Sequence, residues 1–578
     1  MLNFLSLQIK KLHAQTGWYY FILSKTMVNC VTLYSVCTIN NHKPHILQIM
    51  NLSFKIASHL LACMLLLSSC TLFEPVPRLP SVPLLYFNFN GNNVSSGIEP
   101  FKVYGNQKMS YATGVIDSCL NLDITSFYRK PLVLETKGKF IPGEQSAFSV
   151  MVWVKMESSD HESYGIIGNK SLGIESERGW IISKTISGSW QLEVSDGYQN
   201  QKYTATPVRQ KINDNKWHQL GFMMDKSEQV ARCYFDGKLV GVLNLNDIQS
   251  FDADYNLYIG CNPGSIDYTK DTFNGMIDEV GIWSQRLSDH HFADAFRFVK
   301  KERLSSNPKS GETIKVMTWN IWNGGKQQGK KVGLDRIAQC IKNNGADIVA
   351  LQEEFGSGEY LADVLDYYFY RRSLNLCLLS RYPLGKSYNI YKPINAGGVE
   401  VLISEDQKIV VCPVWLSFKP NIKGLLMNEE ISSDTILLIE NATRANEATF
   451  ILSEISKLSN ELNSSSLILA GDFNSGSHLD WTEENKANKY NKVVPFPATL
   501  KMEQAGFTDA YRHIWPDPSQ QPGNTFSPIF KEDYNDRIDF IFYKGKHLKA
   551  IEAIIIDSTS TPLFPSDHAA VMVTFGLQ

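Results

Sequence analysis

Acidic, amide and imidazole side chains follow short apolar runs in the second half of this 578-residue chain. They are Asn320, Glu353, Asp472, Asn474, Asp539, Asp567 and His568. Carboxylate and amide oxygens are the ligands that Mg²⁺ and Mn²⁺ prefer, and a histidine exchanges a proton near neutral pH. Together these groups suit attack on a phosphate ester, which requires charge neutralisation, deprotonation of a water and stabilisation of the leaving oxygen.

Strands and helices alternate around these residues, and this alternation predicts an α/β domain with two packed sheets over residues 313–578. The candidate side chains then lie where strands end. We expect helices near 333–343 and 444–459, and strands at 314–325, 346–354 and 466–474 with another that includes 377–383.

Short motifs occur in a distinctive order in this segment. Strands that end in Asn320 and Glu353 are followed by GDFN at 471–474, RIDFIF at 537–542 and PSDHAAV at 565–571. In this order the segment resembles the endonuclease/exonuclease/phosphatase superfamily, which includes deoxyribonuclease, abasic-site endonucleases, sphingomyelinases and inositol-phosphate phosphatases. The resemblance implies the four-layer α/β sandwich of deoxyribonuclease and a Mg²⁺- or Mn²⁺-dependent hydrolase of phosphodiesters or phosphomonoesters.

The resemblance also implies which residues hold the metal. Glu353 and Asn320 are the expected pair, joined by Asp539 or Asp567. Glu354 is an adjacent competitor for Glu353, but alternation along a strand points the two side chains to opposite faces. The pattern that follows Gln352 in the family favours Glu353.

The same resemblance implies roles at the phosphate. Asp472 is expected to orient or deprotonate the attacking water, and Asn474 to donate to phosphoryl oxygens. His568, held by a carboxylate such as Asp539 or Asp567, is expected to contact the scissile phosphate as a stabilising group or as an acid/base.

One position departs from the family pattern. Deoxyribonuclease and sphingomyelinase relatives carry a second histidine at the end of the strand that matches residues 409–418, where this chain has Trp415. His478 and His513 are candidates to compensate, although a lone loop histidine is more often only solvated. Arg444 is a further candidate phosphate contact, with a surface charge as the alternative.

Residues 80–298 show short runs of Val, Ile, Tyr and Trp punctuated by Gly, Asn and Asp, which predicts an all-β sandwich. The segments at 148–156, 215–225, 231–244 and 274–296 resemble a laminin-G-like (concanavalin-like) jelly-roll domain. The resemblance implies a glycan or protein ligand, sometimes with Ca²⁺. Asp278 and Glu279 are candidate Ca²⁺ ligands, with solvated carboxylates as the alternative. Residues 299–312 are the expected linker.

The N-terminal region has the pattern of a targeting signal. In residues 50–69 a cationic Lys55 precedes an apolar stretch that ends in small residues, as in a signal peptide. The ending resembles a bacterial lipobox, which implies a lipid anchor at Cys70 and an exported, membrane-anchored lipoprotein in the periplasm or at the cell surface. Residues 1–49 are then interpreted as an upstream extension from a misassigned start.

Charge leaves the substrate class open. The formal net charge of the chain is -3, and residues 313–578 contain 31 acidic against 26 basic residues. A protein that holds bulk nucleic acid through its phosphates usually shows a basic surface, so the sequence has no strong nucleic-acid footprint. The alternative from another class is a surface glycan-binding or adhesive lipoprotein with a degenerate hydrolase domain.

Overall fold

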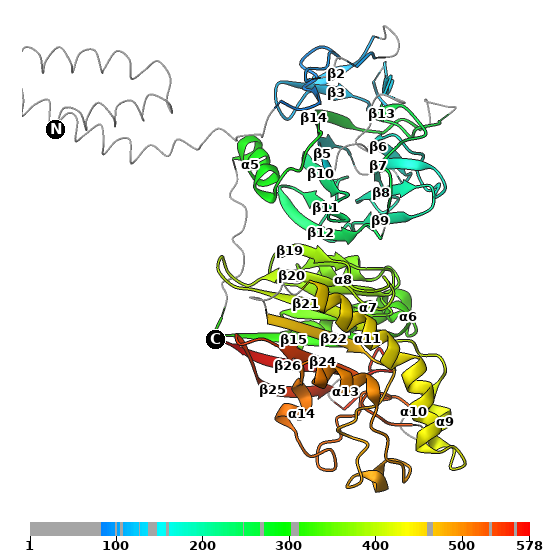
Figure 1. Cartoon of the computed structure of the whole chain (residues 1–578). Coiled ribbons are helices and arrows are strands. Elements are labelled where there is room, and N and C mark those ends of the chain that lie inside the picture. Colours follow the sequence, from blue (N-terminus) through cyan, green and yellow to red (C-terminus); the bar gives the residue numbers. More distant parts are fainter. Residues whose placement is uncertain are drawn as a thin grey trace, which may run out of the picture. The chain divides into compact units, whose positions relative to one another are not determined.

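The computed structural model describes most of the chain after residue 81 (Figure 1). The described ranges are 82–98, 101–103, 108–126, 128–136, 147–157, 161–246, 248–265, 271–301, 311–458, 466–530, 534–559 and 563–578. The predicted upstream extension, the signal peptide and Cys70 lie outside these ranges, so export and lipidation stay predictions. None of the helices in the described ranges is long and apolar enough to cross a membrane.

The first region is a sandwich of two antiparallel sheets, as the sequence predicts. Phe222 of one sheet packs edge-on against Trp180 of the other, with ring centroids 5.0 Å apart. One sheet has the order β2-β3-β14-β5-β10-β11-β12, with β1 beside β14, and the other β4-β13-β6-β7-β8-β9. The strands are β1 (Leu85–Phe87), β2 (Tyr111–Thr113), β3 (Ser118–Asn121), β4 (Leu132–Leu134), β5 (Ala147–Lys155), β6 (Tyr164–Gly168), β7 (Arg178–Lys184), β8 (Trp190–Asp196), β9 (Asn200–Thr204), β10 (His218–Asp225), β11 (Val230–Phe235), β12 (Lys238–Asn244), β13 (Leu257–Ile259) and β14 (Met276–Trp283).

Helix α5 (Asp289–Lys300) lies at the C-terminal end of this region. It starts at Ser288 and ends at Lys301, whose left-handed backbone donates its N–H to the carbonyl of Arg297. The helix therefore extends into the predicted linker. Arg297 and Lys300 lie in its last turn, where basic side chains interact favourably with the helix dipole.

The second region contains two further groups of strands with helices on both outer faces. The first group has the order β17-β18-β16-β15-β26-β25 and the second β19-β20-β21-β22-β24-β23. The strands are β15 (Thr313–Asn320), β16 (Ile348–Gln352), β17 (Tyr368–Arg371), β18 (Leu376–Ser380), β19 (Leu384–Tyr388), β20 (Gly398–Leu402), β21 (Lys408–Trp415), β22 (Ser466–Asp472), β23 (Thr508–Asp509), β24 (Asp539–Lys544), β25 (Leu548–Ile556) and β26 (Ala570–Leu577).

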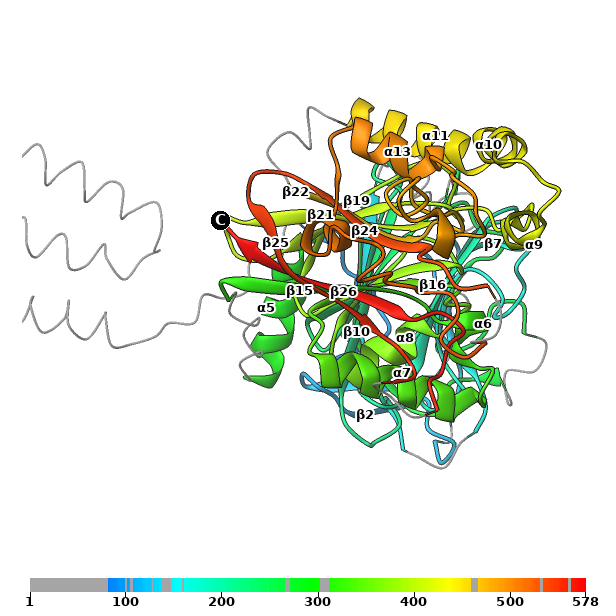
Figure 2. The same ribbon diagram turned by 90° about the horizontal axis from the view of Figure 1, so that it is seen from below.

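Helices complete a four-layer α/β sandwich, as predicted. Figure 2 shows α7 and α8 on one side of the strands and α11 and α13 on the opposite side. The helices are α6 (Trp322–Gly325), α7 (Lys330–Asn344), α8 (Gly358–Leu365), α9 (Ile422–Met427), α10 (Ser433–Ala442), α11 (Arg444–Lys457), α13 (Pro497–Gln504) and α14 (Ala510–Ile514), with a 3₁₀ turn at Lys486–Asn488.

The two regions share a sheet. Strand β12 of the jelly-roll pairs in parallel with β17, with Gly241 opposite Phe369 and Leu243 opposite Arg371. This pairing continues one sheet from the jelly-roll into the second region. Residues 77–578 accordingly form one compact unit.

The predicted Ca²⁺ carboxylates of the jelly-roll have partners within the chain. Asp278 is buried and accepts the backbone N–H groups of Val115, Ile116 and Glu279. Glu279 accepts the hydroxyl of Tyr86. Burial raises the pKa of each carboxyl to about 7. The structure thus places both side chains in local hydrogen bonding that fastens β14 to neighbouring segments.

Glu279 makes the stability of the protein depend on pH. Its folded pKa lies above the ordinary value of 4.5, so the folded state holds the proton more tightly and stability falls as pH rises towards 7. We expect this group to cost on the order of 1–2 kcal/mol between pH 5 and pH 8, after allowance for its partial exposure. Thermal unfolding of Glu279→Gln should therefore show a weaker loss of stability over this range; identical pH slopes for variant and wild type would refute the assignment.

Candidate active site

Strand register brings the predicted catalytic residues together. Strand β22 pairs with β24 so that Asp472 lies opposite Asp539, and β15 pairs in parallel with β16 so that Asn320 lies opposite Gln352, next to Glu353. Directly opposite Cα atoms in an antiparallel pair are about 4.5–5.5 Å apart. The ends of four strands from two sheets therefore meet at one place.

Asp472 lies at the centre of this group. It is buried, and one carboxylate oxygen accepts the backbone N–H of Asn474 at 2.8 Å. The other oxygen accepts the amides of Asn320 at 3.0 Å and Asn474 at 3.1 Å. Burial and the neighbouring Asp539 raise the pKa of Asp472 to about 7. Asn474 has a φ of 47°, a left-handed conformation that asparagine tolerates, and this turn directs both donors to Asp472.

His568 is paired with Asp539. Its Nδ1 lies 2.9 Å from Oδ2 of Asp539, and no described residue hydrogen-bonds its Nε2. Burial alone would lower the pKa of this imidazole, but Asp539, Asp472 and Asp567 together raise it to about 10. Of the two carboxylate partners that the sequence leaves open for His568, the structure selects Asp539.

Glu353 is held on the other side of the group by Asn320. Its Oε1 accepts the Asn320 amide at 3.1 Å, and its Oε2 accepts the backbone N–H of Asn323 at 3.0 Å. The backbone of Glu353 has a φ of 54°, which is strained for a residue of this type and is typical of functional sites. Glu354, the competitor, is fully buried and points instead to Arg371. The two side chains diverge as expected, but β16 ends at Gln352, so the left-handed backbone of Glu353 rather than strand alternation separates them.

The donor set fits a hard divalent cation. Ligand atoms of Asp472, Asp539 and His568 lie within 4.8 Å of one another. Oδ1 of Asp539 and Oδ1 of Asp567 are buried, and among the described residues neither has a hydrogen-bond partner. A buried carboxylate oxygen without a partner is costly unless a cation or donor satisfies it. Burial, together with the nearby Glu353 and Asp539, raises the pKa of Asp567 to about 6.

Several supporting residues escaped the sequence analysis. The Ser566 hydroxyl donates to the Asn320 carbonyl and accepts the backbone N–H of His568, which links β15 to the SDH turn. The indole N–H of Trp319 donates to the His568 carbonyl at 2.8 Å. Thr525 Oγ1 accepts the backbone N–H of Asp539. Only Ser566 lies in a motif that signals the site; Trp319 and Thr525 act through long-range contacts.

Trp415 occupies the end of β21, opposite Asp472 in the strand register. Its indole Nε1 is buried and has no partner among the described residues. The ring lies 6.0 Å from that of Phe418, which is half exposed. An indole N–H donates a hydrogen bond but does not transfer its proton, so this residue leaves the acid function of the missing histidine unfilled.

The three predicted substrate contacts lie elsewhere. The ring nitrogens of His478 are engaged by Thr499 and Glu503 of α13, at 3.0 and 2.6 Å. His513 packs beside Tyr543, four residues along β24 from Asp539, or roughly 13 Å at the usual strand rise.

Arg444 is fully buried rather than a surface charge, because it forms an ion pair with Glu440 at 2.8 Å. Glu440 also accepts the hydroxyl of Ser475, the residue after Asn474. This network supports the GDFN turn from behind, and Arg444 is neither the candidate phosphate contact nor the surface charge that the sequence left open.

Family comparisons agree with the order of the two regions. Residues 136–292 match the model of the concanavalin A-like lectin/glucanases superfamily. Residues 317–568 match the model of the endonuclease/exonuclease/phosphatase family, and this range contains all seven candidate residues.

Individual relatives cover about half of the chain. An uncharacterised protein of Caenorhabditis elegans is 28% identical over 298 residues, which are 47% of this chain and 94% of that protein. Truncated TDP2 of C. elegans is 18% identical over 46% of this chain and 97% of its own, with a TM-score of 0.33. The human Nocturnin catalytic domain is 18% identical over 47% of this chain and 97% of its own, with a TM-score of 0.32.

Proposed function

Because the chain carries a concanavalin A-like lectin/glucanase domain followed by an endonuclease/exonuclease/phosphatase domain, we propose that it hydrolyses phosphoesters with the help of Mg²⁺ or Mn²⁺. The observation that supports this proposal best is the buried group of Asp472, Asp539 and His568, in which Asp539 keeps one oxygen without a partner. A purely structural cluster would be expected to satisfy that atom.

The divalent ion would be held by oxygens of Glu353 and Asn320 together with Asp539 or Asp567. When bound it supplies positive charge that offsets the charge of the phosphate and of the developing leaving group. These carboxylates otherwise repel one another in a buried site, so the ion also stabilises the arrangement.

The protein groups carry the proton and orientation steps. Asp472 would orient the attacking water and accept its proton, and the raised pKa of Asp472 suits a base near neutral pH. Asn474 and Asn320 fix the orientation of its carboxylate. His568, aligned by Asp539, would present Nε2 to a phosphoryl oxygen as a donor.

A substrate panel tests this proposal on the full chain. We expect turnover of a generic bis-aryl phosphate in Mg²⁺ or Mn²⁺, and its loss in EDTA with recovery on addition of the metal. Plasmid DNA, sphingomyelin and inositol phosphates in parallel assays would separate diester from monoester and nucleic acid from lipid. Absence of any EDTA-sensitive turnover across the panel would contradict the proposal.

Trp415 favours the competing function, a glycan-binding protein with a degenerate hydrolase domain, because it replaces a residue that relatives use as an acid. A glycan array with the full chain would then give binding while the panel gives no turnover. Binding together with EDTA-sensitive turnover would instead assign a recognition role to the jelly-roll of an active enzyme.

A further inference from the structure

Arg371 connects the jelly-roll to the buried interior of the second region. Arg371 as a residue is 5% exposed. Its guanidinium donates three hydrogen bonds: Nε to Glu354 at 3.1 Å, Nη2 to Glu359 at 2.5 Å and Nη1 to the backbone carbonyl of Lys202 at 2.8 Å. Lys202 lies on β9, the last strand in the order of its sheet. The jelly-roll thus supplies an uncharged hydrogen-bond acceptor for the buried guanidinium of Arg371, beside its two carboxylate partners.

Glu354 carries this contact to the turn that bears Glu353. The second carboxylate oxygen of Glu354 accepts the backbone N–H groups of Ser357 and Gly358, both at 2.9 Å, at the start of α8. Glu353 immediately precedes it with a left-handed backbone. A strained residue keeps its conformation only where its surroundings enforce it. The buried ion pair between Arg371 and Glu354 holds the residue that follows Glu353 in place.

Helix α8 has a second attachment to the jelly-roll. Asp363 accepts the backbone N–H and the hydroxyl of Thr206, the amide of Gln210 at 2.7 Å and the guanidinium of Arg209 at 3.3 Å. Helix α8 therefore meets jelly-roll residues near both ends, but only the contact at its start, through Arg371, involves Glu354, the neighbour of Glu353.

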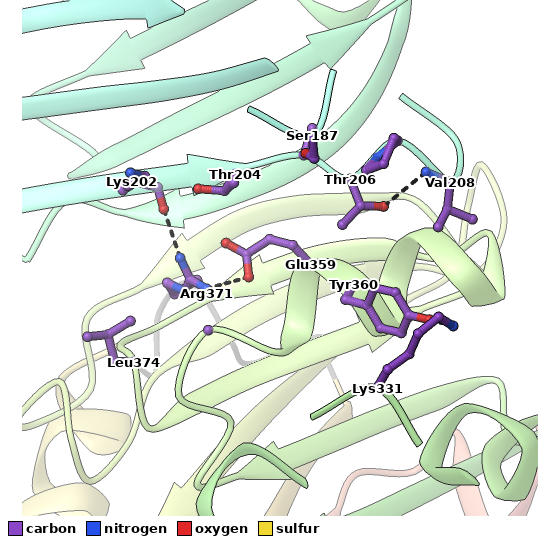
Figure 3. Close-up of a pocket in the computed structure, with 13 residues that line it drawn as sticks. Ser187, Lys202, Thr204, Thr206, Val208, Lys331, Glu359, Tyr360, Arg371 and Leu374 are labelled. Atoms are coloured by element: carbon purple, nitrogen blue, oxygen red, sulfur yellow. Dashed lines mark hydrogen bonds and ion pairs between the residues drawn. The ribbon is translucent and has the colours of Figure 1, made fainter. Parts of the chain in front are cut away.

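A cavity of about 570 Å³ opens beside these contacts. Figure 3 shows Arg371 between the carbonyl of Lys202 and the carboxylate of Glu359, with Thr204 and Thr206 on the jelly-roll side. Gly356 and Leu374, which flank the Glu353 turn, also line it. Solvent in this cavity does not separate the ion pairs, because Arg371, Glu354 and Glu359 are all buried.

We propose that the jelly-roll is a structural part of the catalytic site, and that Arg371 is a positioning residue that holds Glu353 in its metal-binding conformation. This inference rests on the proposed function, because it assigns Glu353 to the metal. The jelly-roll then has a role beyond the glycan or protein ligand that its resemblance implies, because β9 and β12 complete the support of the Glu353 turn.

Arg371→Lys in the full chain is the main test. Lysine keeps the charge but lacks the planar fork, so it cannot bond Glu354, Glu359 and Lys202 together. We expect its affinity for Mn²⁺, measured by titration calorimetry, to fall about 10–100-fold, as is usual for residues that support metal ligands. The concentration of Mn²⁺ for half-maximal turnover should rise in parallel.

Two variants serve as matched controls. Arg209→Lys weakens the same interface at Asp363 and Asp366 but has no bond to Glu354. Lys202→Ala removes a side chain that lines the cavity and leaves the backbone carbonyl that Arg371 uses. Both should bind Mn²⁺ within about twofold of the wild type, since neither alters the support of Glu353.

The outcomes separate this inference from the proposed function. Wild-type turnover with unchanged Mn²⁺ affinity in a folded Arg371→Lys would overturn the inference alone, and so would an equal loss in Arg209→Lys. Mn²⁺ binding without turnover of any phosphoester would overturn the proposed function alone. If Arg371→Lys fails to fold, Glu359→Gln decides instead: weakened Mn²⁺ binding supports the inference and unchanged binding refutes it.

Discussion

Asp472→Asn should lower the turnover number about 10³–10⁴-fold, the upper range for the loss of a positioned general base. Asparagine has nearly the same shape, but it carries no charge and cannot accept a proton from water. The side-chain amides of Asn320 and Asn474 both donate to one carboxylate oxygen of Asp472. In the variant an amide replaces that carboxylate, so the charged group that the two asparagines orient is lost. Steady-state kinetics at saturating Mg²⁺ would measure the effect.

Folding of this variant is an independent readout. Asp472 is buried close to Asp539, and their repulsion contributes to its raised pKa. Removal of one charge relieves that repulsion and offsets part of the lost hydrogen bonding, so the variant should remain folded in EDTA at the assay temperature. A folded Asp472→Asn that retains more than about a tenth of wild-type turnover would exclude Asp472 as the base.

Sequence motifs predicted which residues meet in the candidate site, because these residues lie at or just beyond strand ends that are visible as apolar runs. GDFN ends β22, RIDFIF begins β24, and Asn320 ends β15. Glu353 and Glu354 point apart as expected, although both lie beyond the end of β16, where alternation along the strand no longer applies. The pairing of Asp472 with Asp539 could not be read in the same way, because register between distant strands depends on packing that no local pattern encodes.

Arg444 and His478 have partners that the sequence does not reveal. Arg444 lies on the helix before the GDFN strand, and His478 follows the GDFN loop as a candidate to replace the histidine that is absent at Trp415. The structure gives each of them a partner that sequence separation conceals: Glu440 lies one helical turn before Arg444 across a helix boundary, and Glu503 lies on α13. A charged residue next to a motif therefore indicates support of the site as readily as contact with the ligand.

The relation between the two regions was also hidden from the sequence. Polar residues at 299–312 predicted a linker between the two domains and gave no sign of a contact between them. In the structure β12 and β17 pair in parallel, and Arg371 donates a hydrogen bond to the carbonyl of Lys202. The composition of a segment can identify it as a linker, but it does not show which surfaces of the two joined domains pack against each other.

His568→Asn should lower the turnover number about 10²–10³-fold, the usual range for removal of one donor to the charge that develops in the transition state. The asparagine amide occupies the place of Nδ1 and can still donate to Asp539, so the variant removes Nε2 while it keeps the buried carboxylate paired. His478→Asn is the matched control, because that histidine also has a carboxylate partner, Glu503, but outside the catalytic group. We expect the control to retain wild-type kcat and KM, since its ring only fastens the loop to α13. Equal losses in the two variants would show that the effect arises from loop stability, and the assignment of Nε2 of His568 to the phosphate would then be wrong.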